Sequence, residues 1–295
     1  MTMTRPLTLL CLLGVFLTAC EPAPRTILIK EGNVMDGSGS PAIRADVLIR
    51  GDRIEAVGNL GDVAADEVID ATGLYVTPGF IDPHSHAGGG LATEELSHAE
   101  PLLAMGLTTI LANPDGRGPV DLARQRNALL AHGVGVNVAQ LVPHGSIREA
   151  VLGNEDRGAE PAEFERMKDM VRAGMEQGAW GLSSGTFYVP AFYAPPEELE
   201  ALALVVAPYG GAYTSHIRDE SSYSVGLMAA VDEVIEVGRV AGIPVVLTHV
   251  KALGPDVWGS SSAIVERVER ARAEGIRVFA DQYPYTASAT GLDAV

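Results

Sequence analysis

The sequence predicts an α/β fold in which parallel strands alternate with helices. Beyond Leu74, short apolar runs recur along the chain, and each run after the first follows a glycine. Amphipathic stretches separate the runs. One of them, "SSSAIVERVERARAEG", begins with serines and ends with basic residues and a glycine, as helices often do. Strands that alternate with helices in this way form a parallel sheet covered by helices.

The composition is that of a globular protein. The chain has 295 residues, of which 47% are hydrophobic and 20% are charged, enough for one large domain with an appendage. Its formal net charge of -17 would repel the phosphate backbone of DNA or RNA. We therefore exclude nucleic acid as a partner.

Residues 1–20 are predicted to form a lipoprotein signal peptide. Arg5 gives a positive start, the stretch 7–17 is apolar but too short to span a membrane as a helix, and "LTAC" ends at Cys20. This ending resembles a bacterial lipobox, in which the cysteine is lipidated and becomes the first mature residue. The alternative is an ordinary export signal with a coincidental cysteine. The lipobox predicts an exported protein anchored through Cys20 to a bacterial membrane, facing the periplasm or the cell exterior. Because Cys11 would be removed, no thiol would remain for a disulfide, a nucleophile or a metal.

Residues 21–73 are predicted to form the N-terminal part of a small β-sandwich. "TILIKEG", "ADVLIRGDRIEAVG" and "DEVIDATG" alternate apolar and polar residues, as strands with one buried face do. Gly51 and Asp52 lie between two such runs and suit a tight hairpin. Three or four strands with one apolar face need a partner, so the segment is part of a sandwich or sheet rather than a complete domain.

Residues 74–295 are predicted to form a TIM (β/α) barrel whose eighth strand is missing. The strand candidates are the run before His84, "LTTILA", "VGVNVAQLV", "AWGLSSG", "GAYTSHI", "IPVVLTHV" and "IRVFADQY". Polar residues recur at the carboxyl ends of these runs: His84, His86, Asn113, Asp115, His144, Ser183, Ser184, His216, His249, Asp281 and Tyr283. A barrel gathers all strand ends around one mouth, whereas an open, doubly wound sheet leaves the outer ones far from the site. The first unit has no Gly-x-Gly-x-x-Gly fingerprint, which also favours the barrel.

Four of these histidines indicate a metal site. Residues i and i+2 of an extended chain face the same side, so His84 and His86 can converge on one ion. His216 and His249 come from later strands at equivalent positions. Imidazole suits zinc, which activates water near neutral pH and polarises a carbonyl. A single histidine at a strand end is more often a hydrogen-bonded surface residue, but the doublet with two more at matching ends favours zinc.

The same motifs resemble a known family. "TPGFIDPHSH", "SHIRDE" and "THVK" are similar to the amidohydrolase superfamily, whose members are metal-dependent barrels with a small flanking β-sandwich. The longer phrases "GAWGLSSGTFYVPAFYAPPEELEAL" and "YTSHIRDESS" most resemble the N-acyl-D-amino-acid deacylases, or D-aminoacylases.

The resemblance implies a ligand set of His84, His86, Asp115, His216 and His249 for one or two zinc ions. The first two would hold one metal position, and His216 with His249 the other. D-aminoacylases carry a cysteine where this chain has Asp115, and a carboxylate can also bind zinc. The alternative for Asp115 is a turn residue, because Pro-Asp-Gly is itself a turn signal; Asn113 is a weaker candidate ligand. Many amidohydrolases have a bridging lysine on the fourth strand, but "WGLSSG" has none, which argues against a hydantoinase or dihydropyrimidinase.

Substrate contacts are expected from Arg218, Lys251 and Tyr283. Arg218 and Lys251 each follow a ligand histidine by two residues, so period two would keep them facing the mouth, where they could hold a carboxylate. The alternative for Arg218 is an ion pair, for example with Asp219 or Glu220. The resemblance implies that Lys251 and Tyr283 contact the substrate.

The expected activity is the hydrolysis of N-acyl-D-amino acids to a carboxylate and a D-amino acid. In the family, an aspartate at the end of the eighth strand is the general base, and it would lie beyond residue 295. We therefore expect a C-terminally truncated chain that is poorly stable and catalytically weak or inactive by itself. The alternatives are another amidohydrolase that acts on cyclic or linear amides, and a non-catalytic lipoprotein that binds a metal or ligand.

Overall fold

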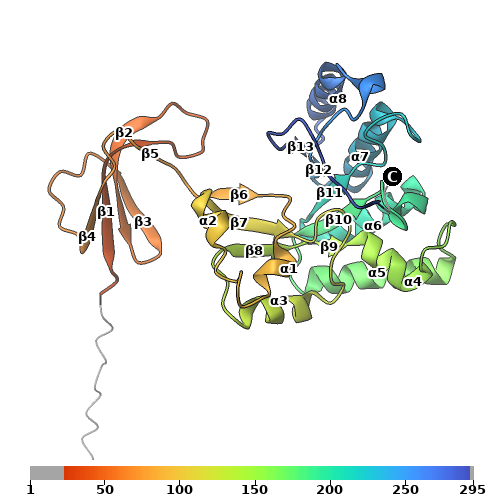
Figure 1. The fold of residues 1–295 in the computed structure, drawn as a ribbon, viewed down its shortest axis with the longest axis horizontal. Helices are drawn as coiled ribbons and strands as arrows, with labels where there is room; N and C mark the ends of the chain where they lie inside the picture. The colour runs from red at the N-terminus through yellow and green to blue at the C-terminus, as the bar shows by residue number, and fades with distance from the viewer. Residues whose placement is uncertain (1–22, 293–295) are drawn as a thin grey trace, which may run out of the picture. The chain divides into compact units, whose positions relative to one another are not determined.

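A computed structural model describes residues 23–292, so the predicted signal peptide and Cys20 lie outside the described residues. The chain divides into two compact units between Pro78 and Gly79 (Figure 1). The boundary predicted at Gly73 is slightly earlier, because the last strand of the first unit includes Val76.

The first unit is a five-stranded sheet with β1 at its centre. Its strands are β1 (Thr26–Val34), β2 (Ile43–Arg50), β3 (Arg53–Gly58), β4 (Glu67–Asp70) and β5 (Tyr75–Val76). β1 pairs antiparallel with β2 and parallel with β4 and β5, while β2 pairs antiparallel with β3. Gly51, in the predicted hairpin turn between β2 and β3, has a φ of 61°, which glycine adopts at low cost. Val34, Ala45 and Val47 are buried on this sheet. The described residues of this unit form this one sheet layer.

The second unit contains parallel strands for all seven predicted runs. They are β6 (Phe80–Asp82), β7 (Leu107–Ala112), β8 (Asn137–Gln140), β9 (Val142–Pro143), β10 (Gly181–Gly185), β11 (Ala212–His216), β12 (Val245–Leu247) and β13 (Val278–Ala280). The third run is interrupted at Leu141, so that β8 pairs with β7 and β9 pairs with β10.

The strands pair in chain order, as β6-β7-β8 and as β9-β10-β11-β12-β13. The run that holds β8 and β9 links the two sheets. This order is the one a barrel uses, whereas a doubly wound sheet reverses direction at its first strands. The α/β class with parallel strands is therefore confirmed. Within residues 23–292, β6 and β13 stand at the ends of the order and do not pair with each other.

Helices cover the outer side of these strands (Figure 1). The helices are α1 (Gly88–Leu91), α2 (Glu100–Ala104), α3 (Leu122–Leu130), α4 (His144–Leu152), α5 (Pro161–Glu176), α6 (Pro196–Val206), α7 (Leu227–Ala241) and α8 (Ser261–Ala273), with 3-10 turns η1 (Ala191–Tyr193), η2 (Ala207–Tyr209) and η3 (Pro255–Val257). α5 to α8 pack successively against β9 to β13 and bury a continuous apolar core. This core fixes the strands, and through them the positions of the residues that follow each strand end. None of the described helices combines the length and apolarity required to cross a membrane.

Candidate metal centre

A cavity of about 920 Å³ lies at the carboxyl ends of the parallel strands. The titratable side chains that line it are Asp82, His84, His86, Asp115, Tyr188, His216, Glu220, Tyr223, His249, Lys251, Asp281, Tyr283 and Tyr285. The cavity gathers residues that follow β6, β7, β11, β12 and β13, because parallel strands in chain order end at one edge. All five predicted metal ligands are among them.

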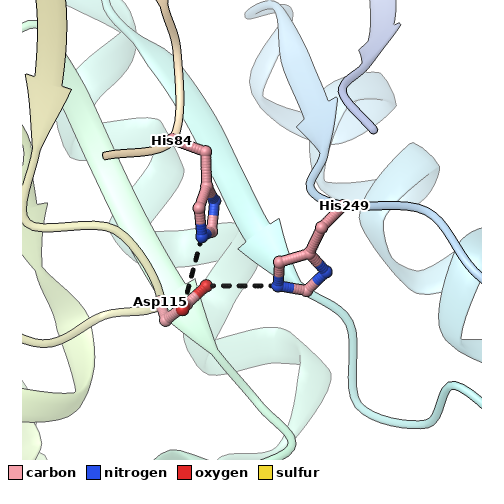
Figure 2. Close-up of side chains that lie close together, drawn as sticks. All are labelled: His84, Asp115 and His249. Carbon is pink, nitrogen blue, oxygen red and sulfur yellow. Dashed lines mark ion pairs between the residues drawn. The ribbon is translucent and has the colours of Figure 1, made fainter. Parts of the chain in front are cut away.

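The Asp115 carboxylate lies among the four histidines. Its Oδ2 is 3.1 Å from Nε2 of His86 and 3.5 Å from Nε2 of His84. Its Oδ1 is 3.7 Å from Nε2 of His249 and 3.8 Å from Nδ1 of His216. Figure 2 shows this carboxylate between the rings of His84 and His249. One carboxylate therefore faces four ring nitrogens that come from three different strand ends.

The turn that carries Asp115 explains how the carboxylate reaches this place. Asp115 has a φ of 56°, and the N–H of Arg117 donates to the carbonyl of Pro114 at 3.1 Å. A Cβ at Gly116 would lie 3.0 Å from backbone atoms of Gly145 and Gly185, so the turn requires glycine there. The turn interpretation and the ligand interpretation of Asp115 are thus compatible, because the Pro-Asp-Gly turn aims the carboxylate into the cavity.

The segment that carries the first two histidines is held by hydrogen bonds from the backbone N–H groups of His84 and Ser85. Asp82 Oδ1 accepts the N–H of His84 at 3.0 Å, and the carbonyl of Leu111 accepts the N–H of Ser85 at 3.0 Å. The strand itself ends at Asp82, so both histidines lie in the segment that follows it. Their rings are nevertheless close, with centroids 5.2 Å apart.

The donor atoms suit a metal cation. Oδ1 of Asp115, Nδ1 of His84 and both ring nitrogens of His216 are buried and have no hydrogen-bond partner. Burial alone would raise the pKa of Asp115, but the nearby imidazoles of His249, His84 and His86 outweigh it and hold this pKa well below its usual range. Buried donors without partners are costly unless a ligand satisfies them. A borderline cation that accepts imidazole and carboxylate ligands, such as zinc, would do so.

Glu220 is a site residue that the sequence reasoning missed as a contact of the metal ligands. Its Oε1 is 3.2 Å from Nδ1 of His249 and 3.7 Å from Nε2 of His216, and it pairs with Nζ of Lys251. Burial lowers the pKa of His216 to about 4. Burial would also lower the pKa of His249, but hydrogen bonds to Asp115 and Glu220 raise it to about 9. The signal that could have revealed Glu220 is its position four residues after His216 in "SHIRDE".

The substrate-contact predictions have different outcomes in the structure. Lys251 and Tyr283 line the cavity, and Nζ of Lys251 lies 5.5 Å from the centroid of the Tyr283 ring. Arg218 does not reach the cavity, and the prediction that it faces the mouth is wrong. Its guanidinium pairs with Glu233 at 2.8 Å and donates to the carbonyls of Phe192 and Ala194. Each of its three guanidinium nitrogens donates to these partners, and they thereby hold a loop and helix α7 together.

The sequence pattern of the Amidohydrolase family matches residues 67–289. The chain belongs to this family. This amidohydrolase is 35% identical to a D-aminoacylase and 39% identical to an N-acyl-D-glutamate deacylase, both from Alcaligenes xylosoxydans xylosoxydans. The two alignments cover 92% and 90% of the chain, and 60% and 58% of the relatives. The amidohydrolase chain thus spans somewhat over half the length of the curated relatives that it matches.

Solved structures that resemble this chain include the same kinds of deacylase as these relatives. An N-acyl-D-glutamate deacylase from Bordetella bronchiseptica, complexed with zinc and a phosphonate mimic of the tetrahedral intermediate, superposes with a TM-score of 0.81 at 35% identity. The match covers 89% of this amidohydrolase and 59% of that chain. A D-aminoacylase with a binuclear metal centre superposes with a TM-score of 0.81 at 32% identity, over 90% of this chain and 59% of the other. An L-hydantoinase from Arthrobacter aurescens, at 20% identity and a TM-score of 0.62, shares the fold.

Proposed function

We propose that this chain carries the metal centre of an enzyme that hydrolyses the amide bond of N-acyl-D-amino acids to a carboxylate and a D-amino acid. The observation that carries the proposal is the cavity in which four imidazoles face the Asp115 carboxylate. Lys251 and Tyr283 line the same cavity. The similarity to D-aminoacylase and to N-acyl-D-glutamate deacylase supports this substrate class.

The residues that would hold one or two zinc ions are His84, His86, Asp115, His216 and His249. A zinc ion in this place supplies the Lewis acidity that polarises an amide carbonyl and eases the ionisation of the attacking water. The burial of donor atoms of His84, Asp115 and His216 limits competition from solvent water, whereas the side chain of His86 is exposed. The protein groups then have the tasks of binding and orienting the amide.

Lys251 and Tyr283 would bind the substrate. The ammonium of Lys251 is the basic group of the cavity wall beside the histidines, so it would pair with the carboxylate of the amino acid. The hydroxyl of Tyr283 would donate to the oxygen that becomes negative during attack on the carbonyl. With its carboxylate bound by Lys251 and its carbonyl oxygen bound by Tyr283, the substrate would have its amide bond oriented toward the imidazole cluster.

The test is the release of amine from N-acetyl-D- and N-acetyl-L-amino acids by the full chain. We expect slow hydrolysis of the D series, loss of this activity with a chelator, and recovery when zinc is restored. His216→Asn should abolish turnover, whereas the exposed His132→Asn, outside the cavity, should not. Hydantoins and lactams in the same assay test a preference for cyclic amides. Faster turnover of these compounds than of N-acetyl-D-amino acids would contradict the proposal. Zinc binding without hydrolysis of any amide would favour a non-catalytic, metal-binding lipoprotein.

We also propose that the protein is exported and anchored to a bacterial membrane through a lipid on Cys20. The support is the apolar stretch that ends in "LTAC". Mass spectrometry of the mature N-terminus from a bacterial host should find a diacylglyceryl cysteine. The variant Cys20→Ser should remain unprocessed and unlipidated. A mature terminus at any other residue would contradict the anchor.

A further inference from the structure

One oxygen atom of Glu220 contacts both a predicted metal ligand, His249, and a predicted substrate-binding residue, Lys251. Its Oε1 faces Nδ1 of His249 at 3.2 Å and also pairs with Nζ of Lys251. The carboxylate is buried, with a side-chain exposure of 6%, and its backbone carbonyl accepts the N–H of Leu253 at 2.8 Å. The segment with Glu220 is thereby tied to the segment that carries His249 and Lys251.

Lys251 competes with Glu220 for the same ring nitrogen. Nζ of Lys251 lies 2.8 Å from Nδ1 of His249, which is hydrogen-bonding distance. A neutral imidazole has one donor and one acceptor nitrogen. If the ammonium donates to Nδ1, the ring proton must be on Nε2, the nitrogen that faces Asp115. If Nδ1 donates to Glu220, Nε2 is free of a proton and can bind a metal.

We propose that Glu220 is a positioning residue that fixes the metal-binding tautomer of His249 against competition from Lys251. In this role it accepts the proton of Nδ1, which leaves Nε2 as a ligand, and its pairing with Nζ of Lys251 gives the ammonium an acceptor other than Nδ1. This inference rests on the proposed zinc centre, but not on the identity of the amide that is hydrolysed. It predicts that the loss of zinc affinity caused by removing Glu220 should depend on the presence of Lys251.

The experiment measures zinc affinity by competition with a chromophoric chelator, using the full chain. Glu220→Ala should weaken zinc binding about 10- to 100-fold, as loss of a carboxylate behind a ligand histidine does. Lys251→Met alone should leave zinc affinity close to that of the wild type. The double variant Glu220→Ala/Lys251→Met should recover most of the lost affinity, because no ammonium then occupies Nδ1. Glu236→Ala, at an exposed site on α7, is the control and should bind zinc like the wild type.

Two results would overturn the inference. One is wild-type zinc affinity in Glu220→Ala; the other is a double variant no better than Glu220→Ala. Circular dichroism and thermal melting show whether each variant folds. If Glu220→Ala fails to fold, the nearly isosteric Glu220→Gln with and without Lys251→Met carries the same comparison. A wild type that binds zinc but hydrolyses cyclic amides faster than N-acyl-D-amino acids would refute the proposed function and leave this result valid, whereas a wild type without zinc affinity would refute both.

Discussion

Asp281 holds the backbone of His249. Its Oδ1 accepts the N–H of His249 at 2.6 Å, and His249 has a φ of 37°, which is uncommon for a residue other than glycine. The carbonyl of Asp281 accepts the N–H of Val250 at 3.0 Å. Asp281, which directly follows β13, therefore acts as a clamp: it fixes the backbone of the segment after β12. This clamp keeps the His249 ring in the metal centre.

Removing this clamp should weaken metal binding. We predict that Asp281→Ala lowers zinc affinity about 10-fold and destabilises the fold by about 1.5–3 kcal/mol, the cost of losing a hydrogen bond to a charged group. Asp281→Asn keeps an acceptor oxygen and should lose less of both. Chelator competition and urea unfolding measure the two effects. Equal losses in the alanine and asparagine variants would contradict the clamp.

Zinc binding should release a proton and should tighten as the pH rises. In the metal-free protein, hydrogen bonds to Asp115 and Glu220 raise the pKa of His249 to about 9, against the burial that would lower it. His249 is therefore protonated at pH 7, and zinc must displace the proton on Nε2. We expect zinc affinity to rise up to about tenfold per pH unit until about pH 9.

Calorimetry at constant pH in buffers of different ionisation enthalpy counts this proton directly. The expected value at pH 7.5 is about one proton released per zinc bound.

The same raised pKa of His249 also determines how the stability of the metal-free protein changes with pH. In the metal-free protein, this histidine stabilises the fold fully below about pH 6.5 and loses that contribution as the pH rises through about 9. Proton uptake on zinc binding would contradict the assignment.

Lys251 should matter for the carboxylate of the substrate rather than for the chemistry at the amide. We predict that Lys251→Met raises KM for N-acetyl-D-amino acids by an amount that corresponds to about 2 kcal/mol, with a much smaller change in kcat. The matched control is the amide of the same substrate, in which the carboxylate is replaced by a neutral group. For that compound the wild type and the variant should differ little. A fall in kcat on both compounds would place Lys251 in the chemical step instead.

The strands and the place of the four histidines in the cavity could be predicted from the sequence, because both depend on short-range patterns. Each apolar run became a strand, and the carboxyl ends of parallel strands meet whatever the loops do. His84, His216 and His249 stand directly at or after such ends. Asp115 required the resemblance as well, since its Pro-Asp-Gly setting by itself indicates only a turn.

The loop residues could not be predicted by the same rule. Arg218 lies two residues beyond the end of β11, the same distance at which His84 and His249 follow their strands, but its side chain turns to Glu233 on α7. Glu220 enters the cavity from that same loop. Lys251 also follows a strand end, and it reaches the cavity because Glu220 and His249 hold it there. Which way a loop side chain points depends on distant partners that no local pattern contains.

A buried ion pair away from the cavity should govern acid stability. Arg148 on α4 and Glu198 on α6 have side-chain exposures of 0% and 3%, and Nη1 of Arg148 lies 2.6 Å from Oε2 of Glu198. His144 Nε2 lies 2.9 Å from the other carboxylate oxygen, and Nε of Arg148 donates to the carbonyl of Pro190. Burial alone would raise the pKa of Glu198, but His144 and Arg148 outweigh it and lower this pKa.

Because the folded-state pKa of Glu198 is depressed, its stabilising contribution is present above the unfolded value of about 4.3 and is lost as the pH falls through the folded value. We predict that Glu198→Gln lowers the free energy of unfolding at pH 7 by about 3–5 kcal/mol, because Arg148 then stays buried without a counter-ion. The difference from the wild type should narrow as the pH falls below the unfolded value of about 4.3, because the unfolded wild type then takes up a proton on Glu198 that the folded state still resists. Glu236→Gln, which removes an exposed pair with Arg239, should cost less than about 1 kcal/mol. Urea unfolding at pH 7 and in acid measures all three proteins, and a Glu198→Gln penalty that stays constant down to acid pH would show that the lost charge is not the cause.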